Sequence, residues 1–315
     1  MKLTNLFKAA VAVGAATMLM SCAGLDADDA EGALNRSTYN VTTESALRSA
    51  INNATAGDTI NLGANIKLTS QLQLLNSGTS SKKINFNGRG YTIDCSGISS
   101  GWGIKCNGSY WNICNMTIKN APDCGIVFQV GGYNYVYYVK TLNNGDSGLQ
   151  IYNSSNNNYI YKCESYYNYD SANGGENADG YACKLSAGKN NKFEGCIAAY
   201  NSDDGWDLYG QPYSVYFVDC EAKYNGYINS SLTTTANGDG NGFKLGKSGQ
   251  SVKHYLSGCS SHHNLACGYD GNGNTATMSI TNCTASNNKK YQWYRITVCS
   301  LPVPHPWSCR TACRR

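Results

Sequence analysis

Proline is scarce in this chain, with 5 among 315 residues, three of them after Tyr291. Arginine is absent between Arg89 and Arg295, and no apolar run after Met20 approaches the length of a membrane span. A helical hydrophobic period is also missing beyond the first 22 residues. These absences argue against a helical solenoid and a membrane-spanning protein, and they leave lysine as the basic residue available for chemistry in the middle of the chain.

The N-terminus is typical of a bacterial lipoprotein export signal over residues 1–22. Lys2 and Lys8 precede an apolar run from Ala9 to Met20, which ends shortly before Cys22. We expect Cys22 to carry a lipid that anchors the exported protein to the outer membrane or cell surface. Ordinary cleavage near Ala23, which releases a secreted protein, stays open. Residues 23–38 form an acidic tether in this interpretation.

The formal net charge of +4 comes from the two ends of the chain. Eight of the 25 cationic residues lie before residue 22 or after residue 288, where no acidic residue occurs, so residues 22–288 carry a net charge of −4. A mildly acidic body is a poor partner for nucleic acid. Clustered aspartates in such a body favour a divalent cation.

Two sequence patterns recur along the chain. In the first, an Asn stands five residues after a Cys; it begins at Cys163, Cys196, Cys220, Cys259 and Cys283. In the second, a Gly is followed by an aromatic residue or Leu, a variable residue and usually an apolar one; it begins at Gly148, Gly180, Gly205, Gly242 and Gly268. The shortest repeat is about 24 residues, which is typical of a solenoid.

Such short units cannot bury a core alone, so successive units must stack. The 34 glycines and the abundant Asn favour strands and turns over helices, and the Leu spacing of leucine-rich repeats is missing. We therefore expect an all-β solenoid, a parallel β-helix of roughly eight to ten coils over residues 39–288.

Fifteen cysteines in an exported chain ordinarily suggest a disulfide scaffold. Here one Cys recurs per coil, and Val139 occupies the same slot in an earlier coil, which favours an inward stack of free thiols that pack as small hydrophobes. Disulfides remain the alternative. The recurring Asn is expected at a turn, where its amide bonds along the stack.

Two insertions interrupt the repeat between the Asn and the Gly. Asn201 precedes Gly205 by four residues, whereas Asn168 precedes Gly180 by twelve and Asn225 precedes Gly242 by seventeen. Both insertions must leave the same edge of the solenoid, on either side of the coil that contains Gly205. Loops in this arrangement commonly form the walls of a binding cleft.

Acidic residues gather in the coils between these insertions. The residue two places after each Gly faces outward, which puts Asp207 beside Lys244, and the residue just before the Gly gives Asp179 and Asp204. With Asp203, four carboxylates come from two adjacent coils and need a cation between them. Hard oxygen ligands favour Ca²⁺. The alternative is that these aspartates only make turns.

Three segments resemble the active-site segments of polysaccharide lyase family nine pectate lyases. They are Asn177-Ala178-Asp179-Gly180, Ser202-Asp203-Asp204-Gly205-Trp206-Asp207 and Gly240-Asn241-Gly242-Phe243-Lys244-Leu245-Gly246. The resemblance covers roughly residues 39–288 and implies a right-handed parallel β-helix. It implies calcium ligation by Asp179, Asp203, Asp204 and Asp207, catalysis by Lys244 as the base, and polygalacturonate or a related acidic polysaccharide as the substrate. We also expect the protein to be a monomer.

The chemistry agrees with this resemblance. β-Elimination from a 4-linked uronate needs a base for the C5 proton, and calcium on the neighbouring carboxylate stabilises the charge that develops. Some pectate lyases of other families use Arg as the base, but the coils contain no Arg between Arg89 and Arg295. A neutral lysine at the working pH is therefore required.

Three other functions remain to be separated from this one. A polygalacturonase on the same scaffold lacks support because its Gly-His-Gly and Arg-x-Lys segments are absent. A lyase for another uronate, such as alginate, shares the chemistry, and a non-catalytic, calcium-stabilised carbohydrate-binding β-helix shares the acidic cluster.

Residues 289–315 depart from the repeat, and we expect either a frame-shifted or truncated gene end or a natural cap.

Overall fold

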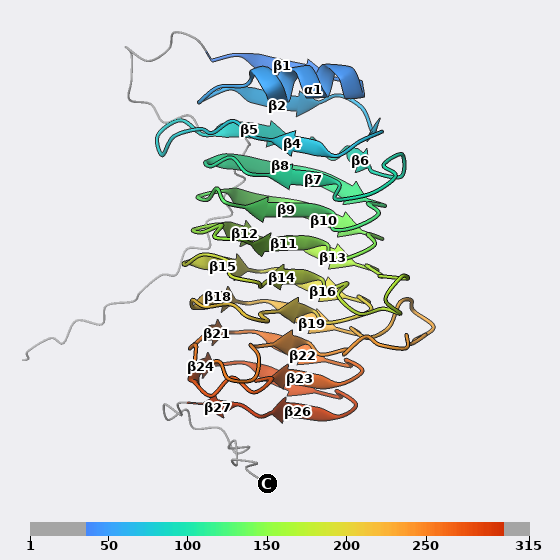
Figure 1. Ribbon diagram of the computed structural model, residues 1–315, viewed down its shortest axis with the longest axis vertical. Helices are drawn as coiled ribbons and strands as arrows, with labels where there is room; N and C mark the ends of the chain where they lie inside the picture. The colour runs from blue at the N-terminus through green and yellow to red at the C-terminus, as the bar shows by residue number, and fades with distance from the viewer. Residues whose placement is uncertain (1–35, 299–315) are drawn as a thin grey trace, which may run out of the picture. The chain divides into compact units, whose positions relative to one another are not determined.

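Each repeat becomes one coil of a parallel β-solenoid in the computed structural model, which describes residues 36–298 (Figure 1). The strands of successive coils pair in parallel and in register from one end of this region to the other. The solenoid has about 11 turns. The expected eight to ten coils were slightly too few, because the first and last coils lack the Cys and Asn pattern that revealed the others.

One side of the solenoid is a nine-stranded parallel sheet whose later strands follow the repeat glycines, and we call it the Gly sheet. Its strands are β4 (Leu72–Leu74), β7 (Ile104–Cys106), β9 (Ile126–Gln129), β11 (Leu149–Tyr152), β14 (Tyr181–Cys183), β17 (Trp206–Asp207), β20 (Phe243–Lys244), β23 (Cys267–Asp270) and β26 (Tyr291–Tyr294).

The remaining strands form an 18-stranded parallel sheet with two rows, which the long strands β8 (Trp111–Lys119) and β10 (Tyr135–Leu142) join. The first row contains β1 (Thr38–Val41), β2 (Thr59–Leu62), β5 (Ile84–Asn87), β12 (Tyr159–Tyr161), β15 (Asn191–Glu194), β18 (Val215–Val218), β21 (Tyr255–Ser257), β24 (Thr277–Thr281) and β27 (Thr297–Val298). The second row contains β3 (Ile66–Lys67), β6 (Thr92–Asp94), β13 (Glu164–Tyr166), β16 (Ile197–Ala199), β19 (Glu221–Lys223), β22 (Ser260–His262) and β25 (Thr284–Ser286).

The interior is built from columns of identical or similar side chains. The residues after the last four repeat glycines point inward and, together with Trp293 in the last described coil, form an aromatic stack in which successive ring centroids lie 4.2–4.9 Å apart. Its members are Tyr181, Trp206, Phe243, Tyr269 and Trp293. Because alternate residues of a strand face opposite sides, this inward stack fixes the next position of each strand on the outer face.

The two predicted polar columns are confirmed. The cysteines at positions 163, 196, 220, 259 and 283 are free, and each thiol donates to the backbone carbonyl two residues before it, at 3.4–3.5 Å. The asparagines form a ladder in which each amide donates to the next carbonyl, for example Asn225 Nδ2 to Asn264 Oδ1 at 3.0 Å and Asn264 Nδ2 to Asn288 Oδ1 at 2.8 Å. The ladder gives each buried amide a hydrogen-bond partner, which an isolated turn would not provide.

A single described helix, α1 (Glu44–Asn53), lies at the N-terminal end of the solenoid and was not expected from the sequence. Thr43 caps it by accepting a hydrogen bond from the backbone N–H of Ala46 at 3.2 Å. Leu47, Ala50 and Ile51 are buried against the first coils. This short i, i+3, i+4 pattern was the missed signal, and burying its two large side chains contributes about 3 to 6 kcal/mol before entropic costs.

The last described coil continues past Asn288, where we placed the end of the repeat. Strand β26 pairs with β23, and β27 pairs with β24. Trp293 stacks on Tyr269 with centroids 4.2 Å apart, so an aromatic residue continues the interior column where the Gly pattern stops. Paired strands therefore continue past Asn288 to Val298, the last described residue. The predicted export signal, most of the tether, and the tail after Val298 lie outside the described residues.

Two inserted loops, 169–179 and 226–241, leave the same side of the stack, as expected (Figure 1). They contact each other: Asn237 N donates to Gly174 O at 2.9 Å, and Asn237 Nδ2 donates to Asn173 O at 2.8 Å. Ser202 Oγ, in the coil between them, donates to Gly175 O at 2.7 Å. The loops are thus fixed over the coil that contains Gly205.

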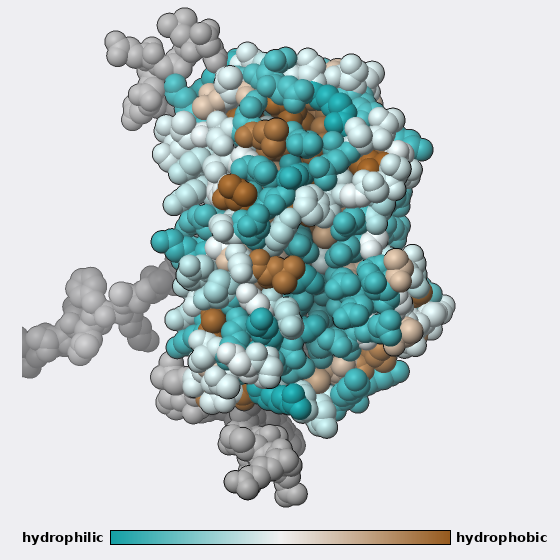
Figure 2. All heavy atoms as spheres, viewed as in Figure 1, coloured by the Kyte–Doolittle hydropathy of each residue, from teal (hydrophilic) through white to brown (hydrophobic). Residues whose placement is uncertain are grey.

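The exterior of the solenoid is mostly polar. The face in Figure 2 is largely hydrophilic, with separate hydrophobic spots rather than one continuous patch. None of the described helices has the length and apolar character needed to span a membrane.

Candidate active site

The outward column of the Gly sheet places Lys244 next to Asp207. The strand register pairs Gln150 with Ala182, Ala182 with Asp207, Asp207 with Lys244, and Lys244 with Asp270. This is the order expected from the sequence. Because neighbouring strands lie about 4.8 Å apart, one carboxylate and one ammonium project side by side from adjacent coils.

Three of the four predicted ligands, Asp179, Asp203 and Asp204, form a tight buried group, which we call the acidic group. Asp179, Asp203 and Asp204 each offer a carboxylate oxygen, and these oxygens all lie within 4.8 Å of one another. The three side chains are at most 3% exposed. Asp179 and Asp204 both precede a repeat glycine, so the repeat itself brings them together across one coil spacing.

Backbone donors fix the orientation of these carboxylates. Asp203 accepts hydrogen bonds from the backbone N–H groups of Asn177, at 3.1 Å, and Asp239, at 2.6 Å. Both donors belong to the inserted loops, one to each. Asp204 Oδ1 accepts from the backbone and the side-chain amide of Asn241 at 2.8 and 2.9 Å. The loops therefore position the acidic group as well as cover it.

Asp207, the fourth predicted ligand, lies at the edge of this group. Its Oδ1 accepts from Tyr209 N at 2.9 Å, and its Oδ2 lies 3.1 Å from Lys184 Nζ. Lys184 Nζ also lies 2.9 Å from Asp179 Oδ2. The Lys184 ammonium thus joins Asp207 to the buried group. Burial alone lowers the pKa of Lys184, but Asp179 and Asp207 outweigh it and raise the pKa overall.

Lys244 contacts the acidic group from the other side. Its Nζ lies 3.2 Å from Asp204 Oδ2 and 2.8 Å from Asp239 Oδ2, and its side chain is 13% exposed. Burial alone lowers the pKa of Lys244, yet the surrounding carboxylates, Asp204 first and then Asp207, raise it well above its ordinary value. While these carboxylates are ionised, Lys244 stays protonated at neutral pH.

The carboxylates themselves resist ionisation. Burial is the largest cause and raises the pKa of Asp179, Asp204 and Asp203, the last to about 6. Mutual repulsion within the group raises the pKa values further, and the lysines lower them. A group of this kind favours the binding of a cation that offsets both effects.

The acidic group fits a hard divalent cation. Two oxygen ligands about 2.4 Å from one Ca²⁺ are at most about 4.8 Å apart, which is the limit that the three carboxylates meet. Asp204 Oδ2 is buried and accepts no hydrogen bond, although Lys244 Nζ lies near it. An ionised oxygen without a hydrogen-bond donor is available to a metal ion. Asp179, Asp203 and Asp204 would hold such a cation, and Asp207 lies beside them.

Two residues that contact the acidic group or Lys244, namely Lys184 and Asp239, were not assigned to the site from the sequence. Lys184 stands four places after Gly180, an outward position like the one two places after the glycine, so the repeat contained its signal. Asp239 lies in the second inserted loop, outside any repeat column, and its distance from Lys244 depends on how that loop folds back. No spacing rule in the sequence places it.

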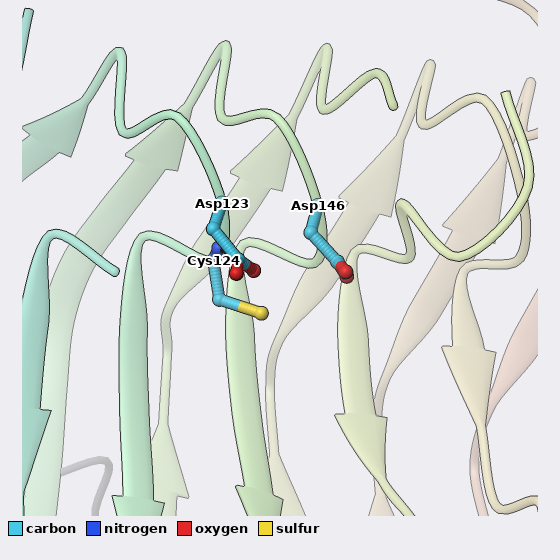
Figure 3. Close-up of side chains that lie close together, drawn as sticks. All are labelled: Asp123, Cys124 and Asp146. Atoms are coloured by element: carbon cyan, nitrogen blue, oxygen red, sulfur yellow. Dashed lines mark hydrogen bonds between the residues drawn. The ribbon is translucent and has the colours of Figure 1, made fainter. Parts of the chain in front are cut away.

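A second group lies further toward the N-terminus on the same sheet. Asp123 and Cys124 come from one coil and Asp146 from the next, and one ligand atom of each lies within 4.8 Å of the others (Figure 3). Burial raises the pKa of the Cys124 thiol, as do both aspartates, and burial also raises the pKa of Asp146. The thiol donates to Gln150 Oε1 at 3.7 Å. A protonated thiol is a poor metal ligand, so this group does not repeat the first one.

Comparisons with known proteins agree with this architecture. The family described as "Pel9A-like, right handed beta helix region" matches residues 26–301. Pectate lyase L of Paenibacillus polymyxa is 39% identical over 204 residues, covering 60% of this chain and 45% of the relative. Pectate lyase PEL9 of Emericella nidulans is 29% identical over 299 residues, covering 83% of this chain and 71% of the relative.

The solved structure of pectate lyase Pel9A superposes with a TM-score of 0.72 at 24% identity, covering 85% of this chain and 78% of that one. This likeness supports the fold. The chain spans less than half the length of the bacterial pectate lyase L relatives that it matches, between 16% and 45%.

Proposed function

Because the chain belongs to the family of Pel9A-like right-handed β-helix proteins, we propose that it is a calcium-dependent pectate lyase that cleaves polygalacturonate by β-elimination. One observation carries this proposal. Lys244 projects from the strand next to Asp207, and its ammonium lies 3.2 Å from a buried carboxylate group suited to calcium. The relatives named above as pectate lyases support the choice of reaction.

Lys244 is the proposed base for the C5 proton of a galacturonate unit. Asp204 and Asp239 hold its Nζ at 3.2 and 2.8 Å, so the amine has a fixed position at the outer surface of the sheet. A general base must be unprotonated at the working pH. The carboxylates around Lys244 oppose this by raising its pKa, and activity is therefore expected to rise toward alkaline pH.

Asp179, Asp203 and Asp204 are the proposed calcium ligands, with Asp207 beside them. When bound, calcium would neutralise these carboxylates, favour the free amine of Lys244 and stabilise the negative charge that develops on the substrate carboxylate. Lys184 keeps Asp179 and Asp207 close together through its two ion pairs. Its role is to position these carboxylates rather than to take the proton.

The same chemistry sets the substrate preference. A free uronate carboxylate is needed to meet the metal, so we expect highly methyl-esterified pectin to be a poorer substrate than polygalacturonate. We further propose that the enzyme acts as a monomer, anchored by a lipid on Cys22 and exported to the outer membrane or cell surface.

A panel of uronate polymers tests the function. Purified protein is mixed with polygalacturonate, methylated pectin and alginate, with added calcium or after thorough chelation, and the unsaturated product is measured by ultraviolet absorbance. We expect product from polygalacturonate with calcium and none after chelation. Faster turnover of alginate would change the substrate, and undiminished activity in metal-free protein would remove the proposed role of calcium. Binding without product on every polymer would make the protein a carbohydrate-binding module.

A further inference from the structure

The outward column that contains Asp207 and Lys244 has one more cation, far from the acidic group. The register continues from Gln150 to Val127 in β9 and from Val127 to Lys105 in β7. Lys105 therefore stands four strand spacings from Asp207, on the same face and in the same column. At about 4.8 Å per spacing, this separation is about 19 Å along the solenoid.

Lys105 belongs to a small cluster with exposed aromatic surface. Its Nζ lies over the ring of Trp102, 5.6 Å from the centroid. The same ring meets Tyr152 edge to face, with centroids 6.0 Å apart and an interplanar angle of 71°. Trp102, Lys105 and Tyr152 are all partly exposed. Both contacts restrict the indole, so its orientation is set before any ligand arrives.

This cluster spans more than one coil. Trp102 precedes β7 and Tyr152 ends β11, and the coil between them contributes Val127. Val127 points outward, yet it is 0% exposed, so side chains of the neighbouring coils cover it. Between this cluster and Asp207, the column contains only Val127, Gln150 and Ala182, all at least nine-tenths buried. No large exposed side chain therefore stands in this column between the cluster and Asp207.

We propose that Trp102, Lys105 and Tyr152 form a remote subsite for the acidic polysaccharide whose cleavage is proposed for Lys244. This inference rests on that proposed function. The chemistry is complementary: the apolar face of a pyranose ring packs on an exposed indole, and a uronate carboxylate pairs with a lysine ammonium. A 1,4-linked uronan advances by roughly one strand spacing per sugar, so a chain along the sheet meets this cluster about four sugars from the acidic group.

The charges between this cluster and the acidic group favour attachment of an acidic chain at these two places rather than between them. Asp123 and Asp146 lie shortly before the strands that contain Val127 and Gln150, and their carboxylates repel a uronate. Lys105 and Lys244 are the cationic members of the column from Gln73 to Asp270. A chain that reaches both Lys105 and the acidic group gains contacts that a shorter chain lacks. The subsite therefore makes affinity depend on chain length rather than on the reacting unit.

The test compares oligogalacturonates of three and eight units. With wild-type protein, kcat/KM for the octamer is measured before and after Trp102→Ala and, separately, Lys105→Ala. We expect each substitution to lower the octamer value about 5- to 20-fold, since tenfold corresponds to about 1.4 kcal/mol, and to leave the trimer value unchanged. The matched control is Lys253→Ala, which removes a lysine 5.1 Å from the Tyr255 ring on the other sheet and is expected to change neither.

Binding gives a readout that does not require turnover. Calorimetric titration of the Lys244→Ala protein with the octamer, in calcium, is repeated after adding Trp102→Ala, and thermal unfolding checks that both proteins are folded. A weaker octamer affinity in the double variant supports the subsite. Equal affinity, or an equal loss for trimer and octamer, overturns it while leaving the lyase proposal intact. No turnover of any uronate by the wild type, together with no binding at either length, overturns both.

Discussion

Two rows of buried polar side chains run through the same coils, and they differ in charge. The Asn ladder pairs neutral amides, and both the Oδ1 and the Nδ2 of Asn264 have hydrogen-bond partners. The acidic group places like charges within 4.8 Å and leaves Asp204 Oδ2 without a hydrogen bond. The ladder stabilises the stack, whereas the acidic group strains it until a cation arrives.

This difference shows how one repeat serves two purposes. The ladder continues unchanged past the inserted loops, because its amides need only the coil above and the coil below. The acidic group occurs where two adjacent coils both place an Asp before the glycine. The predictions below test whether the acidic group serves chemistry and the ladder serves stability, beginning with the largest expected effect.

The base should matter for catalysis alone. Lys244→Ala should lower kcat on polygalacturonate about 10²- to 10⁴-fold, the usual loss for a positioned general base, with little change in the fold. Lys244→Arg should fail as well, because guanidinium stays protonated. Near-normal kcat in Lys244→Ala would disprove the proposed mechanism and direct attention to Lys184 or Lys247. Circular dichroism provides the control for folding.

The ladder should matter for stability alone. Asn264→Ala removes an amide that bonds Asn225, Asn288 and Ser261, and leaves buried partners unsatisfied. We expect a loss of about 2 to 4 kcal/mol in the free energy of unfolding, measured by denaturant titration, with kcat/KM retained in the folded protein. Asn53→Ala, at the exposed end of α1, is the control and should cost less than about 1 kcal/mol. Equal losses for the two variants would contradict the role of the ladder.

The acidic group should make the metal-free protein less stable as pH rises. Burial raises the pKa of Asp203 to about 6, above the value near 4 of an unfolded chain. The protonated Asp203 carboxyl therefore contributes its full share to the free energy of unfolding below about pH 4, and this contribution is lost as pH rises through about 6. In chelator, this change should cost about 2 to 3 kcal/mol.

Thermal unfolding between pH 4 and 7 measures this effect, and in a His254→Gln background Asp203→Asn should flatten the profile. His254 acts in the opposite sense: burial lowers its pKa to about 4, so its contribution is present above about pH 6.5 and lost as pH falls through about 4. His254→Gln separates the two effects. If the stability of the His254→Gln protein still rises with pH, the assignment of the effect to Asp203 is wrong.

Calcium should stabilise the folded protein through the acidic group. At ten times the Kd, binding to the folded state contributes about 1.4 kcal/mol, which appears as a higher melting temperature. Asp204→Ala should remove this shift at the same calcium concentration and regain part of it in excess metal, together with part of the turnover. Asp94→Ala, which changes a carboxylate 3.8 Å from Lys119 on the other sheet, should keep the full shift.

The sequence by itself determined the repeating features of this protein. Inward and outward positions alternate along every strand, so the recurring Cys, Asn and Gly were enough to predict the solenoid, the free thiol stack, the Asn ladder and the neighbouring places of Asp207 and Lys244. The helix α1 was missed because its apolar pattern occupies less than two turns, and the two described strands after Asn288 were not expected because aromatic packing replaces the glycine pattern there.

Only the tertiary structure decided which charges meet inside the site. Lys184 reaches both Asp179 and Asp207, and Asp239 reaches Lys244 from an inserted loop. These contacts depend on the path of long side chains and of a loop that follows no period. The same holds for Trp102 and Tyr152, whose rings meet across a whole coil. A repeat fixes the position of each backbone segment and the face of each side chain, but not how far a side chain reaches, because its reach depends on the neighbours that pack against it.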